Sequence, residues 1–172
     1  MIAGDLVFAM KHLVYLLSRV FCHSSIQQLM KLLSPSCSFE LSILGYGSDV
    51  TNWRERNSLL CRLSTKWSQK TDSQSLPMKT WEVKRLLNAL KLLWNKAANH
   101  IDVTFAEPGL SVEATALPDD RYRLQIQLDH ALTPAWHSYP DFPVELDLLL
   151  DRSQLQAAIG ELSGQLASYP ER

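Results

Sequence analysis

Hydrophobic and polar residues alternate along three consecutive stretches in the second half of the chain: residues 101–107, 110–117 and 122–130. Alternation with a period of two is typical of strands that bury one face. The turn sequences Pro108-Gly109 and Pro118-Asp119-Asp120 separate these stretches, which favours neighbouring antiparallel strands. We therefore expect a meander whose buried face contains Val103, Phe105, Val112, Ala114, Leu124, Ile126 and Leu128.

Further strands are predicted on either side of this meander. The same period marks residues 39–46 and 58–67, and residues 144–150 are predicted as a last strand. Residues 47–57 and 70–78 are rich in polar and turn-forming side chains, so we predict them as loops. The sequence favours one antiparallel sheet of about five to six strands, without a recognisable internal repeat.

Two segments have the apolar spacing of helices that pack on a sheet. After Thr80, a plausible N-cap, residues 81–100 repeat apolar side chains at i, i+3, i+4 and i+7. Asp151 and Gln154 resemble a capping box. The apolar stripe that follows is Leu155, Ala158, Ile159, Leu162 and Leu166. We predict a central and a C-terminal helix packed on the sheet, and hence an α+β fold.

The first 29 residues are predicted as an amphipathic helical extension, followed by a single α+β domain over residues 30–172. Lys11 and Arg19 interrupt the apolar run of the extension, which leaves no stretch of about 18 apolar residues to span a bilayer. Asp5 precedes any positive charge, unlike a secretory signal. The extension is interpreted as a packing helix, with membrane-surface binding as a minor alternative. A third interpretation is that translation begins at Met30.

The cysteines indicate a reducing compartment. Cys22, Cys37 and Cys61 are odd in number and lack the spacing of a metal site. We expect free thiols and a cytoplasmic location.

The net charge of −1 conceals a division along the chain. Residues 1–100 hold 13 Lys and Arg against 6 Asp and Glu, whereas residues 101–172 hold 4 against 12. The two parts therefore carry +7 and −8. If folding keeps them apart, the protein has a basic and an acidic face; if it mixes them, the charges cancel in weak surface pairs.

Few residues suggest catalysis or metal binding. His130 and His137, flanked by Asp129 and Asp141, straddle a proline-bent loop rather than converging from rigid elements, so we expect no metal site. Glu145 and Asp147 lie on one side of a strand and would serve acid–base chemistry only if buried. No nucleophile, phosphate-binding or dinucleotide motif is present. We expect no catalytic residue and no cofactor.

The loop before the last strand combines Trp136, Tyr139 and Phe142. Trp and Tyr are favoured anchors of binding surfaces. An alternative is that this loop folds back as a lid on the sheet.

The element order and three short motifs resemble the bacterial immunity proteins of the WapI type. The motifs are Glu107-Pro108-Gly109-Leu110 after the central helix, Gln165-Leu166 in the closing helix, and Tyr169-Pro170 with Arg172 at the end. The resemblance covers residues 38–172. It implies a non-catalytic protein that binds and neutralises the C-terminal domain of a cognate toxin. From the residues themselves, we expect no nucleic-acid binding and no stable membrane association.

Under this resemblance, a basic toxin would meet the acidic part of the chain. The candidate toxin-binding residues are Asp119, Asp120, Asp129, Trp136, Asp141, Glu145 and Asp147. Two other classes remain open: a small secretion chaperone, and a hydrolase that uses Glu145, Asp147 or His130.

Overall fold

The computed structural model describes residues 29–47, 55–106, 109–139 and 141–172, and these form two antiparallel four-stranded sheets. Sheet A has the order β1 (Met30–Leu33), β2 (Cys37–Tyr46), β3 (Ser58–Trp67) and β4 (Lys70–Lys79). Sheet B has the order β5 (His100–Thr104), β6 (Leu110–Leu117), β7 (Arg121–Leu128) and β8 (Val144–Asp151). Each sheet is therefore a meander of sequential strands.

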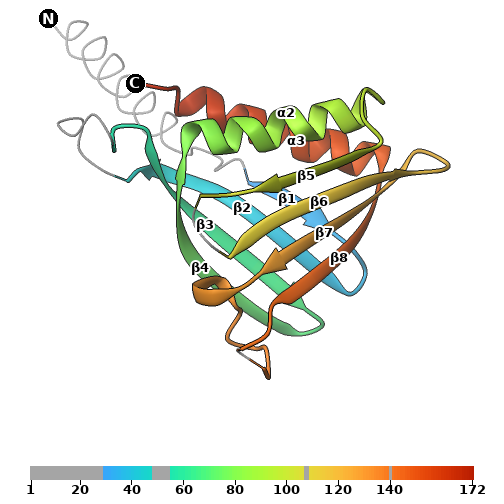
Figure 1. Cartoon of the computed structure of the whole chain (residues 1–172), viewed down its shortest axis with the longest axis horizontal. Helices are drawn as coiled ribbons and strands as arrows, with labels where there is room; N and C mark the ends of the chain where they lie inside the picture. The colour runs from blue at the N-terminus through green and yellow to red at the C-terminus, as the bar shows by residue number, and fades with distance from the viewer. Residues whose placement is uncertain (1–28, 48–54, 107–108, 140) are drawn as a thin grey trace, which may run out of the picture.

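A helix follows each sheet: α2 (Thr80–Trp94) after β4 and α3 (Arg152–Ser168) after β8. A short 3-10 helix, η1 (His130–Leu132), lies between β7 and β8. Figure 1 shows the two sheets layered one over the other, with both helices along one side. The described chain thus repeats one order of elements, four strands and a helix, although the sequence has no recognisable internal repeat.

One hydrophobic core joins the inner faces of both sheets to the two helices. The meander predicted for residues 101–130 is confirmed. Its predicted inward residues are buried, except that Phe105 is only partly covered. The α+β class and the two predicted helices are also confirmed, and the Asp151–Gln154 capping box opens α3 as expected.

The prediction of one sheet with five to six strands was wrong, because the described residues form two four-stranded sheets, and β1 and β4 were not predicted. β1 is too short to show a period. β4 contains Pro77 and is polar on both faces along its first half, but it is an edge strand, where a proline is tolerated. The helix predicted to start after an N-cap at Thr80 includes Thr80, and it ends at Trp94 rather than near residue 100. The predicted N-terminal helix lies outside the described residues.

The two halves interlock through reciprocal contacts of their helices. Glu82, at the start of α2, accepts hydrogen bonds from the backbone N–H of Lys79 (2.7 Å) and from that of Ala106 (2.6 Å), just beyond β5. Gln154, at the corresponding position of α3, accepts from the N–H of Asp151 (2.9 Å) and donates to the carbonyl of Leu33 (3.4 Å), the end of β1. Each helix therefore contacts the first strand of the other half.

Helix α3 also completes the free edge of sheet A. β1 begins at Met30, opposite Leu41 of β2, and among the described residues no strand pairs with the backbone of β2 beyond Leu41 on this side. The buried side chain of Gln165 accepts a hydrogen bond from the N–H of Ile43 (2.6 Å) and donates to the carbonyl of Leu41 (3.2 Å). Because unpaired buried backbone groups are costly, this glutamine acts in place of a strand.

The described cysteines, Cys37 and Cys61, are buried and unpaired, in agreement with free thiols. Burial, with a smaller contribution from the charge of Glu82, raises the pKa of the Cys61 thiol to about 12. Within the described ranges, no helix is long and apolar enough to cross a membrane.

Candidate interaction surface

An exposed aromatic cluster lies where the turn between β3 and β4 meets the connection from β7 to β8, at the lower end of the molecule in Figure 1. The connection, residues 129–143, is fastened to β4. The Asp72 carboxylate accepts hydrogen bonds from the N–H of Ala135 (3.3 Å) and from Nε2 of Gln74 (2.8 Å), and Gln74 also donates to the carbonyl of Thr133 (3.1 Å). The polar residues of β4 thus position this loop.

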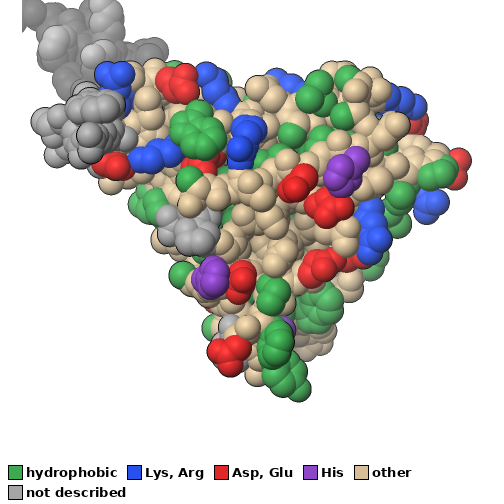
Figure 2. Space-filling view, in the orientation of Figure 1, with side chains coloured by type: hydrophobic (Ala, Val, Ile, Leu, Met, Phe, Trp, Pro, Cys, Tyr) green, Lys and Arg blue, Asp and Glu red, His purple; other side chains and the backbone are tan. Residues whose placement is uncertain are grey.

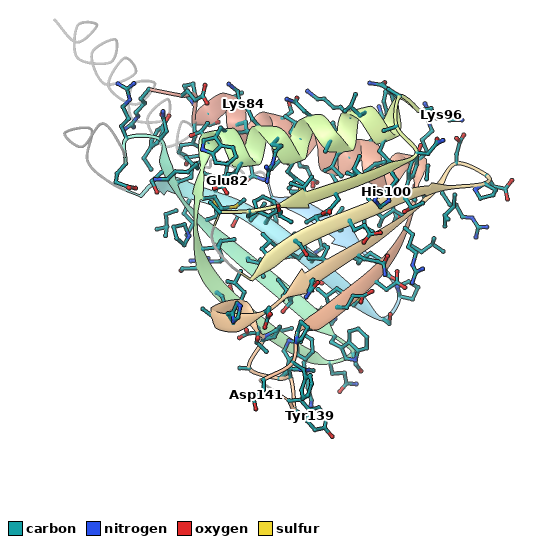
Figure 3. All side chains as sticks on the ribbon, in the orientation of Figure 1. Glu82, Lys84, Lys96, His100, Tyr139 and Asp141 are labelled. Atoms are coloured by element: carbon teal, nitrogen blue, oxygen red, sulfur yellow. The ribbon has the colours of Figure 1, made fainter. Side chains whose placement is uncertain are left out.

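Four rings follow one another across the cluster. Trp67 stacks on Trp136, with centroids 6.2 Å apart, Trp136 contacts His137 edge to face, and His137 contacts Tyr139 in the same way. Tyr139 is 67% exposed, Trp67 is 43% exposed and nearby Phe142 is 65% exposed. We call these five residues the aromatic apex, and Figure 3 shows Tyr139 and Asp141 at its tip.

A pocket of about 670 Å³ opens beside the aromatic apex. Its walls include Trp67, Trp136, His137 and Tyr139, and its two charged lining residues are Lys70 and Glu145. This volume falls in the range of pockets that hold ligands or side chains of a partner. The alternative prediction, that the loop is only a lid on the sheet, therefore accounts for its buried residues but not for the exposed rings.

The outward face of sheet B is acidic. The register places Asp102, Glu113, Gln125 and Asp147 in one row across the four strands, and Glu145 belongs to the next row. All four acids are exposed, and Figure 2 shows acidic side chains over this face. Glu145 connects the face to the pocket at the aromatic apex.

Hydrogen bonds from two side chains of β7 order Glu145 and Asp147 on β8. Arg123 donates to Asp147 through two nitrogens, with Nη2 2.6 Å from Oδ2. This pair lowers the pKa of Asp147 and raises that of Arg123. Gln125 donates to the Glu145 carboxylate. Both acids are thus held in place although they face solvent.

The outward face of sheet A has the opposite character. It presents hydroxyl side chains on β3 and β4, together with the cations Arg62 and Lys66, and the Lys31 ammonium is paired with Glu40 at 2.7 Å. Among the described residues, Arg62 and Lys66 form no ion pair within 4 Å. The outward faces of the two sheets therefore differ in charge, whereas the ion pairs Lys84–Glu171 and Lys96–Asp120 join the basic and acidic parts of the chain elsewhere.

The predicted toxin-binding residues divide into two groups. Trp136, Asp141 and Glu145 lie at or beside the aromatic apex, with Asp129 at the start of the same loop, where its carboxylate accepts from the N–H of His130 (2.7 Å). Asp147 follows on the outward face of β8. Asp119 and Asp120 lie at the opposite end of β7, roughly 25 Å away along an eight-residue strand.

Local ion pairs already engage the acid at that far end. The Asp120 carboxylate is 2.8 Å from Nζ of Lys96 and 3.4 Å from Nη1 of Arg152, and the bond to Lys96 is the main cause of its lowered pKa. Asp119 and Asp120 both have positive φ angles, as their turn requires.

The residues considered for a hydrolase do not form a buried site. Glu145, Asp147 and His130 are all exposed, and Asp147 is bound to Arg123. No group of three or more His, Cys, Asp or Glu side chains in the described part of the chain is placed to hold a metal ion.

Sequence reasoning missed several residues of this surface: Trp67, Lys70, Asp102 and Glu113. Trp67 reaches the aromatic apex only because β4 is a strand, which brings the β3–β4 turn beside residues 129–143. Asp102 and Glu113 could have been found, because both occupy outward positions of strands that were predicted correctly.

The described residues form a two-sheet α+β domain with an exposed aromatic and acidic surface. The chain belongs to the immunity protein WapI-like family, whose model matches residues 31–170. No curated protein matches the chain. The predicted resemblance to the WapI type is therefore confirmed.

Solved structures with a similar arrangement come from distant proteins. One is described as "Crystal structures of trypanosoma bruciei MRP1/MRP2", with a TM-score of 0.50, 10% identity, and coverage of 90% of this chain and 93% of that one. Another is WHY1 from Arabidopsis thaliana, with a TM-score of 0.49, 10% identity, and coverage of 82% and 89%. At 10% identity, the likeness to the first of these structures concerns the fold alone.

Proposed function

We propose that this protein is a non-catalytic immunity protein that binds a cognate toxin domain inside the producing bacterium and neutralises it. The observation that carries this proposal is the family match over residues 31–170. The surface described above supports it, because exposed Trp and Tyr side chains next to acidic residues suit a protein partner that carries positive charge.

The toxin contacts the aromatic apex and the adjoining acidic face of sheet B. Trp136, Asp141, Glu145 and Asp147 fall within this surface. A standard interface covers roughly 800 Å² on each partner, which is enough to include the apex, the end of β7 and the start of β8. We place Asp129 at its border, and Asp119 and Asp120 outside its centre because they lie at the far end of the strands.

The test begins by capturing the partner from the source bacterium with a tagged chain, and then expressing the captured toxin domain in a sensitive host. Co-expression of this protein should restore growth, and the two purified proteins should form an equimolar complex by sedimentation. A toxin domain that stays lethal beside an equimolar amount of folded protein would contradict the proposal.

A matched pair of variants locates the surface. The double substitution Trp136→Ala with Tyr139→Ala should weaken the complex by roughly tenfold or more. Truncating an aromatic hot-spot residue commonly costs about 2 kcal/mol or more of binding free energy. The control, Arg62→Gln with Lys66→Gln on sheet A, should leave the affinity unchanged.

A further inference from the structure

The pocket beside the aromatic apex combines aromatic walls with a carboxylate. Trp67, Trp136 and Tyr139 supply ring surface, and Glu145 supplies the negative charge. A cation near an aromatic face is attracted by the quadrupole of the ring, and a guanidinium can also stack on it. This combination favours a basic side chain over an apolar or acidic one.

The two charged side chains that line the pocket differ in how firmly they are held in place. Lys70 also lines the pocket, and its side chain is exposed at the first residue of the edge strand β4, where it can extend into solvent. Glu145 belongs to a regular strand and accepts a hydrogen bond from Gln125. The exposed Asp141 adds negative charge at the tip of the same loop. An entering cation therefore meets a fixed carboxylate and can displace a mobile ammonium.

We propose that this pocket receives an arginine side chain from the surface of the toxin, held between the aromatic walls and the Glu145 carboxylate. This inference rests on the proposed function. Arginine is preferred to lysine because its planar group stacks on rings and pairs with a carboxylate through two nitrogens.

The test uses the full chain and a small probe, acetyl-arginine-amide. Its neutral isostere, acetyl-citrulline-amide, has almost the same shape without the charge. The indole N–H signals of Trp67 and Trp136 are followed by NMR during each titration. Trp81 and Trp94, which lie on α2, serve as internal controls.

The arginine probe should shift the signals of Trp67 and Trp136 saturably and leave those of Trp81 and Trp94 in place. It should bind roughly five- to tenfold more tightly than the citrulline probe, as expected for one cation on an aromatic carboxylate site. Equal shifts with both probes, or no saturable shift with arginine, would overturn the inference. Tighter binding of acetyl-glutamate-amide than of acetyl-arginine-amide would also overturn the inference, and would indicate that Lys70 determines which charge the pocket binds.

Two substitutions separate the carboxylate of the pocket from the general charge of sheet B. Glu145→Gln should remove most of the preference for arginine over citrulline, whereas Glu113→Gln, on the same outward face but away from the pocket, should retain it. A preference that survives Glu145→Gln would overturn the assignment of Glu145. Growth rescue from the toxin is measured separately. Rescue without binding of the arginine probe refutes only the inference that the pocket binds arginine. Binding of the arginine probe without rescue refutes only the proposed function.

Discussion

The two halves of the molecule have the same order of four strands and a helix, yet their outward faces differ. Sheet A presents hydroxyls and cations, while sheet B presents acids. The connections differ as well: residues 68 and 69 join β3 to β4, whereas residues 129–143 join β7 to β8. The inward pattern is what the fold requires, and the outward residues and connections are free to specialise.

The halves also differ in how deeply their helix contacts are buried. Glu82 is only 2% exposed, whereas Gln154 is partly exposed. Replacing Glu82 with Ala leaves two backbone N–H groups without their acceptor, so we expect a loss of roughly 2–4 kcal/mol in the free energy of unfolding. Gln154→Ala should cost about 0.5–1.5 kcal/mol. Urea denaturation measures both, and equal losses would show that the two contacts are equivalent.

Two glycines provide the next comparison. Gly109 has a φ of +110°, and an added Cβ would lie 2.3 Å from the carbonyl oxygen of Asp129. Gly109→Ala should therefore destabilise the protein by about 1–3 kcal/mol. Gly160, in α3, has open space around the same position, so Gly160→Ala should stabilise it by roughly 0.5–1 kcal/mol. Thermal unfolding of the two variants should give shifts of opposite sign, and shifts of the same sign would contradict this.

The charge difference between the sheets can be tested by association kinetics with the toxin. Glu113→Gln with Glu145→Gln should slow association by roughly three- to tenfold at low salt and flatten its salt dependence, because it removes steering charge. Arg62→Gln with Lys66→Gln on sheet A should not slow association. If the two double variants slow association equally, the acidic face does not steer the toxin.

The smallest effect concerns the ion pair on the outward face of sheet B. Arg123 lowers the pKa of Asp147, so the pair stabilises the fold above the ordinary aspartate pKa and loses this contribution as pH falls through the lowered value. Because both side chains are about half exposed, we expect only a small loss of stability. In Arg123→Gln, NMR titration should show the pKa of Asp147 returning toward its ordinary value. An unchanged pKa would mean that Arg123 is not the cause.

The sequence predicted those elements whose burial follows one simple period. Residues 101–130 alternate strictly because one face meets the core, and the Asp151–Gln154 capping box marks the start of α3 directly. β4 was missed because its first half contacts the loop at residues 129–143 through Asp72 and Gln74 rather than through apolar side chains. The structural repeat was missed because the two halves share the order of four strands and a helix but no recognisable repeat in sequence.

The binding surface was predicted in part for a related reason. Trp136 and Glu145 were recognised from their residue types, but nothing local connects Trp67 with a loop that begins at residue 129. That contact depends on the pairing of β3 with β4 and on the anchoring of the loop. Conversely, Asp119 and Asp120 were grouped with the apex by their charge, although β7 separates them from it.

The completion of sheet A by α3 has a consequence for the order of events during protein synthesis. The partners of Lys31, Leu33 and Ile43 lie 130, 121 and 122 positions later in the chain. When the first four strands have emerged from the ribosome, the β1–β2 edge still lacks the side chains that close it. Unprotected strand edges promote aggregation. Nascent chains that end before residue 152 should therefore depend on chaperones, and the full-length protein should not.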